Sequence, residues 1–235
     1  VDAINAMQAN GLKSVETIGP EIDEPVAEVV EDLIHFSLRL DTESVDRLLE
    51  RGWRNRGPMD FMSHLAGPLL VEVGTRWARG EIGVATEHFI SERLRDFLST
   101  RWRAANASAQ AAKVVCACLP GERHVIGLHL AAVAAALAGV HVVFLGADTP
   151  IRDILSAVDR VGAKAGAVSV AGGASTDLLT HQLKVVRRGL PRQVSLWIGG
   201  TGAGAAVLPE RSEYLHNLER LQTLASRLAE DRTPL

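Results

Sequence analysis

The residue of this sequence with the clearest chemical potential is His124, which lies between an apolar run and a helix-forming run. Glu122 precedes it by two residues and Gly127 follows it by three, which gives the pattern Glu-x-His-x-x-Gly. A neutral imidazole is the commonest metal ligand among side chains, and its second ring nitrogen usually needs an orienting acceptor. Glu122 is near enough to be that acceptor, and Gly127 lets a bulky group approach the backbone. Because the pattern is short, it fits both a metal-binding histidine and an ordinary solvated loop histidine.

A second group of polar residues lies in the first half of the chain. Trp77 comes at the end of one helical pattern, and Glu87 and His88 come one turn into the next. Because consecutive helices joined by a short loop run antiparallel, these ends are expected to meet at one rim of a bundle. Such a rim could cover a flat polar ligand, but an amphipathic Trp beside a surface Glu-His pair explains the same residues.

Glycine-rich loops follow the apolar runs of the second half. Glycine at this density lets the backbone close on a ligand, although a tight structural turn has the same composition. The Gly-x-Gly-x-x-Gly pattern after the first run and the Gly-Lys-Ser/Thr pattern do not occur, so neither a dinucleotide site nor a P-loop is predicted. The candidate binding residues in these loops are Ser169, Val170, Gly172 and Gly173 after one run, and Gly199, Gly200, Thr201 and Gly202 after another.

The elements that carry the Trp77 group are predicted to be helices. Apolar residues recur there at a spacing near 3.6, and short polar or glycine-containing segments separate the patterns. Pro68 marks an expected kink in the third helix. We therefore predict an antiparallel bundle of four helices, at about 24–38, 43–50, 59–79 and 84–105.

After Ala112 the pattern changes to apolar strands that alternate with helices, which predicts an α/β unit with a parallel, doubly wound sheet. Asp148 or Thr149 is expected to cap one of the helices, with Pro150 in its first turn. The strands are expected at 113–119, 140–145, 165–170 and 194–198, and the helices at 128–138, 151–161, 175–189 and 215–228. We divide the chain into 1–23 (linker or remnant), 24–108 (bundle) and 109–235 (sheet).

Composition excludes several classes of function. The 235 residues carry a net charge of −3, which leaves no basic excess for nucleic acid. No uncharged stretch reaches the ~20 residues that span a bilayer, and no secretory signal is visible, so we predict a cytoplasmic protein that does not enter a membrane. Cys116 and Cys118 are expected to be buried, unpaired thiols on opposite faces of a strand. Among the other histidines, His64 is expected in the core, and His129 and His181 at packing or surface positions.

Glu122-x-His124-x-x-Gly127, Ser169-Val170 and Gly199-Gly200 together resemble the cobalamin-binding domain shared by methionine synthase, corrinoid methyltransferase proteins and mutases. The pattern in which Trp77 is followed, after nine residues, by Glu87-His88 resembles the signature of the CarH-type photoreceptors, which sense light with adenosylcobalamin. The similarity covers about residues 24–230. It implies a four-helix bundle that caps a flavodoxin-like (Rossmann-like) sheet domain.

The resemblance implies a base-off, His-on corrinoid between bundle and sheet. His124 would be the lower axial cobalt ligand, held by Glu122, and Arg123 and Gly127 would lie beside the cofactor in the same loop. Trp77, Glu87 and His88 would cover the upper face with its adenosyl group. The nucleotide tail would enter past Ser169, Val170, Gly172, Gly173, Gly199, Gly200, Thr201 and Gly202. The implied role is a regulatory sensor without catalytic residues, with a homo-oligomeric or effector partner.

The sequence departs from this family at one position of the rim. CarH-type proteins have a histidine directly after the tryptophan, and that histidine captures cobalt after photolysis, whereas this chain has Ala78. The DNA-binding domain of that family has no counterpart here, so another partner or a second chromophore, a bilin, is an open expectation. Two further hypotheses remain: a corrinoid methyl carrier of a methyltransferase system, and a plain flavodoxin-like interaction domain without a cofactor.

Overall fold

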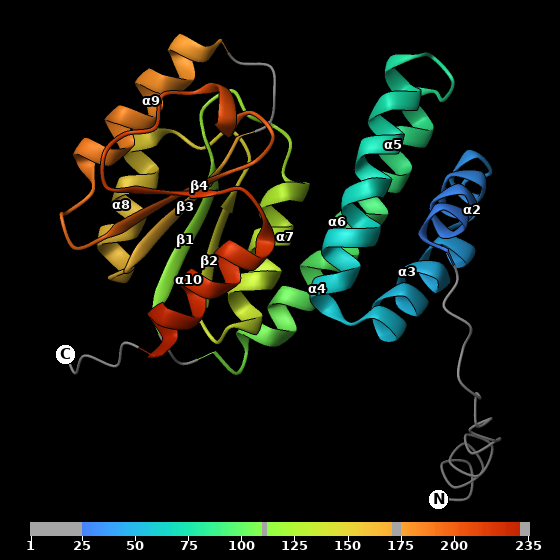
Figure 1. The fold of residues 1–235 in the computed structure, drawn as a ribbon, viewed down its shortest axis with the longest axis horizontal. Coiled ribbons are helices and arrows are strands. Elements are labelled where there is room, and N and C mark those ends of the chain that lie inside the picture. Colours follow the sequence, from blue (N-terminus) through green and yellow to red (C-terminus); the bar gives the residue numbers. More distant parts are fainter. Residues whose placement is uncertain (1–24, 110–111, 171–174, 231–235) are drawn as a thin grey trace, which may run out of the picture.

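The computed structural model describes residues 25–109, 112–170 and 175–230, and the expected linker at 1–23 lies outside them. The first half of the described chain is helical, and the second half is an α/β unit beside it (Figure 1). The helical half contains α2 (Val26–Leu38), α3 (Thr42–Arg56), α4 (Pro58–Asp60), the π-helix η1 (Phe61–Ala66), α5 (Gly67–Ala78) and α6 (Val84–Asn106). None of the described helices is long and apolar enough to cross a membrane.

The helices form near the predicted positions, because their apolar stripes converge on one core, but α3 does not end near Glu50: it continues through the buried Gly52 to Arg56. Asp41 starts α3 by accepting the Ser44 N–H at 3.1 Å, which also lowers the pKa of its carboxyl. Gly57 separates α3 from α4 with a φ of 77°, a conformation that glycine adopts without strain. The core includes the fully buried side chains of Leu33, Ile34, Leu49, Phe61, Leu65, Leu94 and Leu98.

The predicted third helix is continuous from residue 58 to 78, and Pro68 is accommodated by a π segment directly before it. Proline has no N–H to donate, and its ring clashes with the carbonyl four residues earlier in a regular α-helix. The π turn widens the backbone at this point, so that the Gly67 N–H bonds to Met62 O five residues back. The expectation that His64, within this segment, is a core residue is wrong: its side chain is 66% exposed and its Nδ1 lies 2.7 Å from Asp60 Oδ1.

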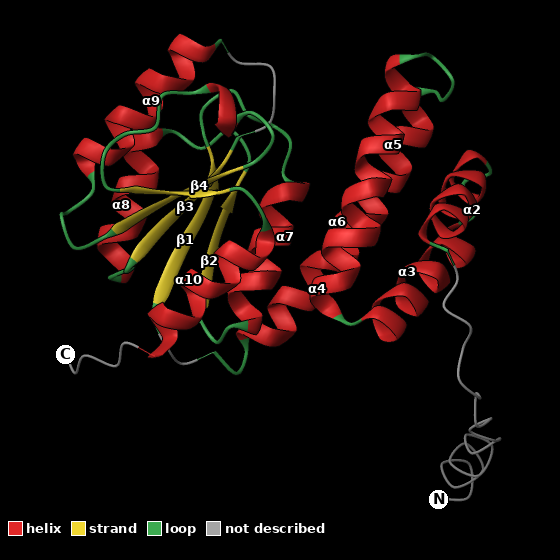
Figure 2. Cartoon of the chain, in the orientation of Figure 1, coloured by secondary structure: helices red, strands yellow, loops and turns green. Residues whose placement is uncertain are grey.

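The second half is a five-stranded, wholly parallel sheet in the order β2-β1-β3-β4-β5 (Figure 2). Helices α7 and α10 cover one face, and α8 and α9 cover the other. This confirms the predicted α/β fold with a doubly wound, flavodoxin-like sheet. The elements are β1 (Lys113–Cys118), α7 (Ile126–Leu137), β2 (His141–Gly146), α8 (Ile151–Val161), β3 (Ala165–Ser169), α9 (Thr176–Gly189), β4 (Ser195–Gly199), η2 (Ala203–Ala205), β5 (Ser212–Leu215) and α10 (Leu218–Glu230).

Three local expectations in the sheet half are wrong. Strand β5 was not predicted, and α10 begins at Leu218 rather than Leu215, because four half-exposed residues at a sheet edge leave no periodic signal. Cys116 and Cys118 are free and buried as expected, but they share one face, since residues two apart on a strand point the same way. The helix α8 has no side-chain cap: Pro150 is its N-cap, and Asp148 and Thr149 bond elsewhere.

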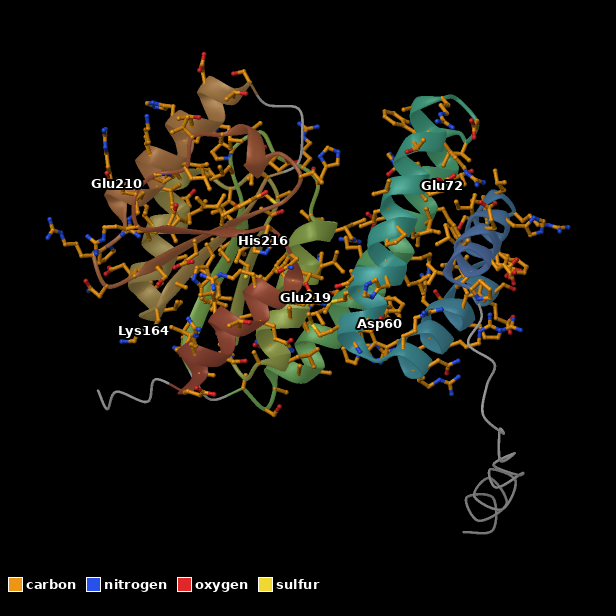
Figure 3. The ribbon with its side chains drawn as sticks, viewed as in Figure 1. Asp60, Glu72, Lys164, Glu210, His216 and Glu219 are labelled. Atoms are coloured by element: carbon orange, nitrogen blue, oxygen red, sulfur yellow. The ribbon has the colours of Figure 1, made fainter. Side chains whose placement is uncertain are left out.

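The bundle joins the sheet through an aromatic joint at the end of α6. The indole Nε1–H of Trp102 donates to Nδ1 of the buried His129 on α7 at 3.1 Å, and Phe144 of β2 stacks on both rings. Asn106 bonds both the N–H and the carbonyl of Val142 in β2, at 2.7 and 3.1 Å. A second link runs from Ser63 Oγ to Glu219 Oε1 on α10, at 3.0 Å, and Figure 3 labels Glu219 between sheet and bundle.

The buried imidazole of His129 predicts a pH dependence of stability. Burial, together with the positive charges of Arg95 and Arg103, lowers its pKa from 6.5 to about 4. The unfolded chain therefore binds more protons between these two pH values, so the free energy of unfolding falls as the pH drops through this window. The loss is on the order of 3 kcal/mol at most, and it is absent above pH 6.5.

Urea unfolding at several pH values measures this effect when the protein is compared with His129→Gln, which keeps an acceptor for Trp102 but does not titrate. The stability advantage of the histidine should shrink as the pH falls, whereas His181→Gln, at an exposed position, should leave the pH profile unchanged. An unchanged profile for His129→Gln would contradict the assignment of a neutral, buried ring.

Candidate functional site

The loop that carries His124 connects β1 to α7 at the carboxyl edge of the sheet. Strand β1 lies between β2 and β3, so this loop and the end of β3 flank the point where the strand order reverses. Ligands of open α/β sheets bind in the crevice at this switch point. The sequence-predicted loop is therefore placed where the fold most readily forms a binding site.

Within this loop, Glu122 holds both the backbone and the ring of His124. Its Oε1 lies 2.7 Å from His124 Nδ1 and accepts the His124 N–H at 2.8 Å. The Glu122 side chain is only 11% exposed, whereas that of His124 is 77% exposed. A carboxylate at Nδ1 places the proton on that nitrogen and leaves Nε2 with its lone pair, which is the orientation found in metal-ligating histidines.

Among residues 25–109, 112–170 and 175–230, no group of three or more His, Cys, Asp or Glu side chains is placed to hold a metal ion. One oriented imidazole suits the metal of a macrocycle, because the macrocycle itself fills most of the coordination positions. The residues fit such a group because they supply one oriented imidazole and an adjoining cavity.

A cavity of about 310 Å³ adjoins the loop, within the size range of small-molecule pockets, roughly 300–1,000 Å³. It lies between the first turn of α7, the ends of β3 and β4, and the β5–α10 connection. A methyl group at Gly127 would lie 3.4 Å from Ser169 Oγ, which is an ordinary van der Waals contact, so Gly127 and Ser169 face each other closely across this end of the cavity. The predicted residues that line the cavity are Gly127, Ser169, Gly199, Gly200 and Thr201.

Three further polar residues of this cavity were missed by the sequence analysis. Tyr214, His216 and Asn217 line it from the β5–α10 connection, and Figure 3 labels His216 at the inner end of α10. His216 and Asn217 were missed because the predicted last helix began at Leu215, and Tyr214 lay directly before that helix; the Tyr-x-His-Asn run ahead of an apolar helical stripe was a signal of a polar loop.

The remaining predicted residues have other surroundings. Val170 is buried in the core on the α8–α9 side, and its carbonyl accepts the Gly202 N–H at 3.0 Å, so both act through the backbone. Arg123 is exposed in the His124 loop and does not line the cavity. Gly172 and Gly173 lie outside the described residues.

The predicted bundle rim forms at the same end of the molecule as the carboxyl ends of the strands (Figure 1). Trp77, in the last turn of α5, is 51% exposed although it is a large aromatic side chain. The His88 ring bonds to Glu87, and Glu87 also accepts the Ser91 hydroxyl at 2.9 Å. None of Trp77, Glu87 and His88 lines the cavity, so the structure gives two separate groups, one on the sheet and one on the bundle.

Comparison with known proteins supports one class of protein. Residues 29–101, within the helical half, match the family model described as the B12 binding domain. The HTH-type transcriptional repressor CarH of Myxococcus xanthus is 30% identical over 173 residues, which are 74% of this chain and 58% of that protein. The chain thus spans less than two thirds of the length of this relative. These matches support a cobalamin-binding protein.

The fold itself is shared with a corrinoid protein. The monomethylamine corrinoid protein of Methanosarcina barkeri superimposes with a TM-score of 0.63 at 13% identity, over 86% of this chain and 99% of that one. At this identity the likeness concerns the fold alone.

Proposed function

We propose that this chain is a light sensor that holds adenosylcobalamin base-off between bundle and sheet, with His124 as the lower axial ligand of cobalt. The observation that carries the proposal is the exposed His124 ring, fixed at Nδ1 by Glu122, in a part of the chain that offers no other set of metal ligands. The neighbouring cavity, with Ser169 at its floor, would receive the nucleotide tail.

The bundle would supply the upper side of the site, consistent with the match of residues 29–101 to the B12 binding domain. When bound, adenosylcobalamin would supply a cobalt–carbon bond that light can break. Trp77 is suited to cover an organic upper ligand, since it is a large aromatic ring left half in solvent. Glu87 and His88 would offer polar contacts to the same ligand from the first turns of α6.

Helix α6 provides a route from the upper side to the sheet. The same 23-residue helix carries Glu87 and His88 near its start, and Trp102 and Asn106 at its end. The carboxyl end of α6 is bonded to α7 and β2. A displacement of the first turns of α6 at the rim would therefore be transmitted along this helix to the sheet. We propose that a partner protein, a further domain or a second copy of the chain receives this signal.

One feature separates this chain from a sensor that relies on a histidine directly after the tryptophan. Ala78 follows Trp77 and has no atom that could bind cobalt. We therefore do not expect capture of cobalt at this position after illumination. A bilin is not part of the proposal, because no feature of the described residues supports a second chromophore.

An absorption spectrum tests the proposal directly. Adenosylcobalamin added to the purified protein in the dark should give a base-off, His-on spectrum, and green light should convert it to a different, stable spectrum. Hydroxocobalamin, which has no photolabile upper ligand of this kind, is the control and should show no comparable change. A bound adenosylcobalamin whose spectrum is unaffected by green light would contradict the sensor function.

The alternative function is a corrinoid methyl carrier, and the shared fold with the monomethylamine corrinoid protein of Methanosarcina barkeri favours it. It would use the same lower site, but it needs an upper face that a methyltransferase can reach. The bulky Trp77 at the rim argues against such access. Transfer of a methyl group between the loaded protein and a partner methyltransferase, together with indifference to light, would establish this alternative. On the sensor proposal the chain has no catalytic residue.

A further inference from the structure

Asp148, in the loop between β2 and α8, lies against the loop that carries His124. Its Oδ1 accepts the Gly121 N–H at 2.7 Å, and its own N–H donates to the Glu122 carbonyl at 2.8 Å. Asp148 thus binds the backbone of two consecutive residues, Gly121 and Glu122. Glu122 is also the residue whose carboxylate orients the His124 ring.

The backbone of Asp148 is held in a conformation that most side chains avoid. Its φ is 45°, in the left-handed region, which aspartate and asparagine tolerate better than other non-glycine residues. Asp148 does not cap α8, whose first turn receives no side-chain bond. A residue keeps a strained backbone conformation only where several surrounding contacts hold it there, and such residues cluster at functional sites.

Other elements fix the same loop from its remaining sides. Gln182 of α9, whose side chain is nearly buried, donates to the Pro120 carbonyl at 3.1 Å. The Thr149 N–H bonds to Cys118 O at 3.2 Å, and the Cys118 thiol donates to the His124 carbonyl at 3.6 Å. The β1–α7 loop is therefore held in place before any ligand arrives, and Asp148 contributes both a side-chain acceptor and a backbone donor to it.

We propose that Asp148 is a positioning residue that presets the Glu122–His124 pair, so that Nε2 of His124 is free and aimed before the cofactor binds. The proposal rests on the proposed function for the identity of the cofactor, cobalamin, but the preset geometry belongs to the protein alone. A preorganised ligand avoids the cost of ordering a loop during binding.

Three substitutions separate the acceptor from the backbone strain. Asp148→Asn keeps an oxygen acceptor and tolerates the positive φ, so it should behave almost like the wild type. Asp148→Gly removes the acceptor but relieves the backbone. Asp148→Ala removes the acceptor and adds strain. Asp159→Ala, at an exposed aspartate of the adjacent α8, is the matched control.

The first measurement uses the protein without cofactor. The ¹⁵N shifts of the His124 ring, recorded above the usual histidine pKa of about 6.5, report which nitrogen carries the proton, and amide exchange reports the protection of Gly121. The wild type and Asp148→Asn should show a proton on Nδ1 and a protected Gly121 amide. Asp148→Gly and Asp148→Ala should both show a mixture of tautomers and faster exchange at Gly121, while thermal unfolding checks that they remain folded.

The second measurement is the affinity for hydroxocobalamin in the dark. Loss of the acceptor should weaken binding about tenfold, the factor that corresponds to 1.4 kcal/mol, with a smaller fraction in the His-on form. Wild-type tautomer and affinity in Asp148→Gly would overturn the proposal, because the acceptor would then be dispensable. If the wild type itself does not bind hydroxocobalamin, the proposed function fails, whereas the ring shifts and amide exchange still decide whether Asp148 presets the pair.

Discussion

Replacing His124 by alanine should abolish the His-on spectrum of the bound cofactor and weaken cobalamin binding by at least about 100-fold. Loss of a residue that only supports a metal ligand typically costs 10–100-fold in metal affinity, so loss of the ligand itself should cost no less. The structure is consistent with so large an effect, since no cluster of three or more His, Cys, Asp or Glu side chains among the described residues is placed to hold the metal instead. Equilibrium titration in the dark, followed by absorption, measures both the affinity and the ligation state.

The matched control for this prediction is His181→Ala, which removes an exposed histidine of α9 outside the His124 loop. It should leave affinity and spectrum unchanged. Glu122→Gln provides an intermediate case, because the amide can still accept from Nδ1 but no longer carries the charge that favours the proton there. A His-on spectrum that survives in His124→Ala would show that another residue ligates the metal, and the site assignment would be wrong.

The fold could be predicted largely from sequence because its elements are long or strongly patterned. Helix α8 was placed at its observed bounds, since an amphipathic pattern between Pro150 and Gly162 leaves little freedom at either end. Strands β1 to β4 are continuous apolar runs, as expected for a parallel sheet covered on both faces. Strand β5 escaped because it is a short edge strand whose residues are half exposed, so its pairing with β4 rather than its own composition creates it.

The candidate site could be predicted only where neighbours in sequence are also neighbours in space. Glu122 and His124 are two residues apart, and the predicted bond between them is present. Asp148 was expected to be a helix cap, because in sequence it stands next to Pro150 and α8. Its actual partner, Gly121, is 27 residues away, and only the parallel pairing of β1 with β2 brings the two loops together. Tyr214, His216 and Asn217 reach the cavity for the same reason, through a strand that sequence alone did not reveal.

Gly200 is the position where a single methyl group should do the greatest damage to the fold. Its φ is 98°, and a Cβ there would lie 2.2 Å from the Val170 carbonyl oxygen, far inside any van der Waals contact. The obstacle is backbone rather than a flexible side-chain end, and this backbone is fixed because the Val170 N–H bonds to Gly199 O and the Val170 carbonyl accepts from Gly202. The ends of β3 and β4 would have to separate to admit the methyl group.

We therefore expect Gly200→Ala to lower the free energy of unfolding by about 3 kcal/mol or more, the sum of backbone strain and overpacking. For a domain of this size that corresponds to a fall in Tm of roughly 6–12 °C. Gly74→Ala is the matched control, because this glycine lies in helix α5 with nothing within 4 Å of an added Cβ. It should leave stability unchanged or raise it by up to about 1 kcal/mol, since alanine favours a helix over glycine. Thermal and urea unfolding of the protein without cofactor measure both variants. Equal stabilities for the two would mean that the close approach of β3 and β4 at Gly200 is not what fixes this wall of the cavity.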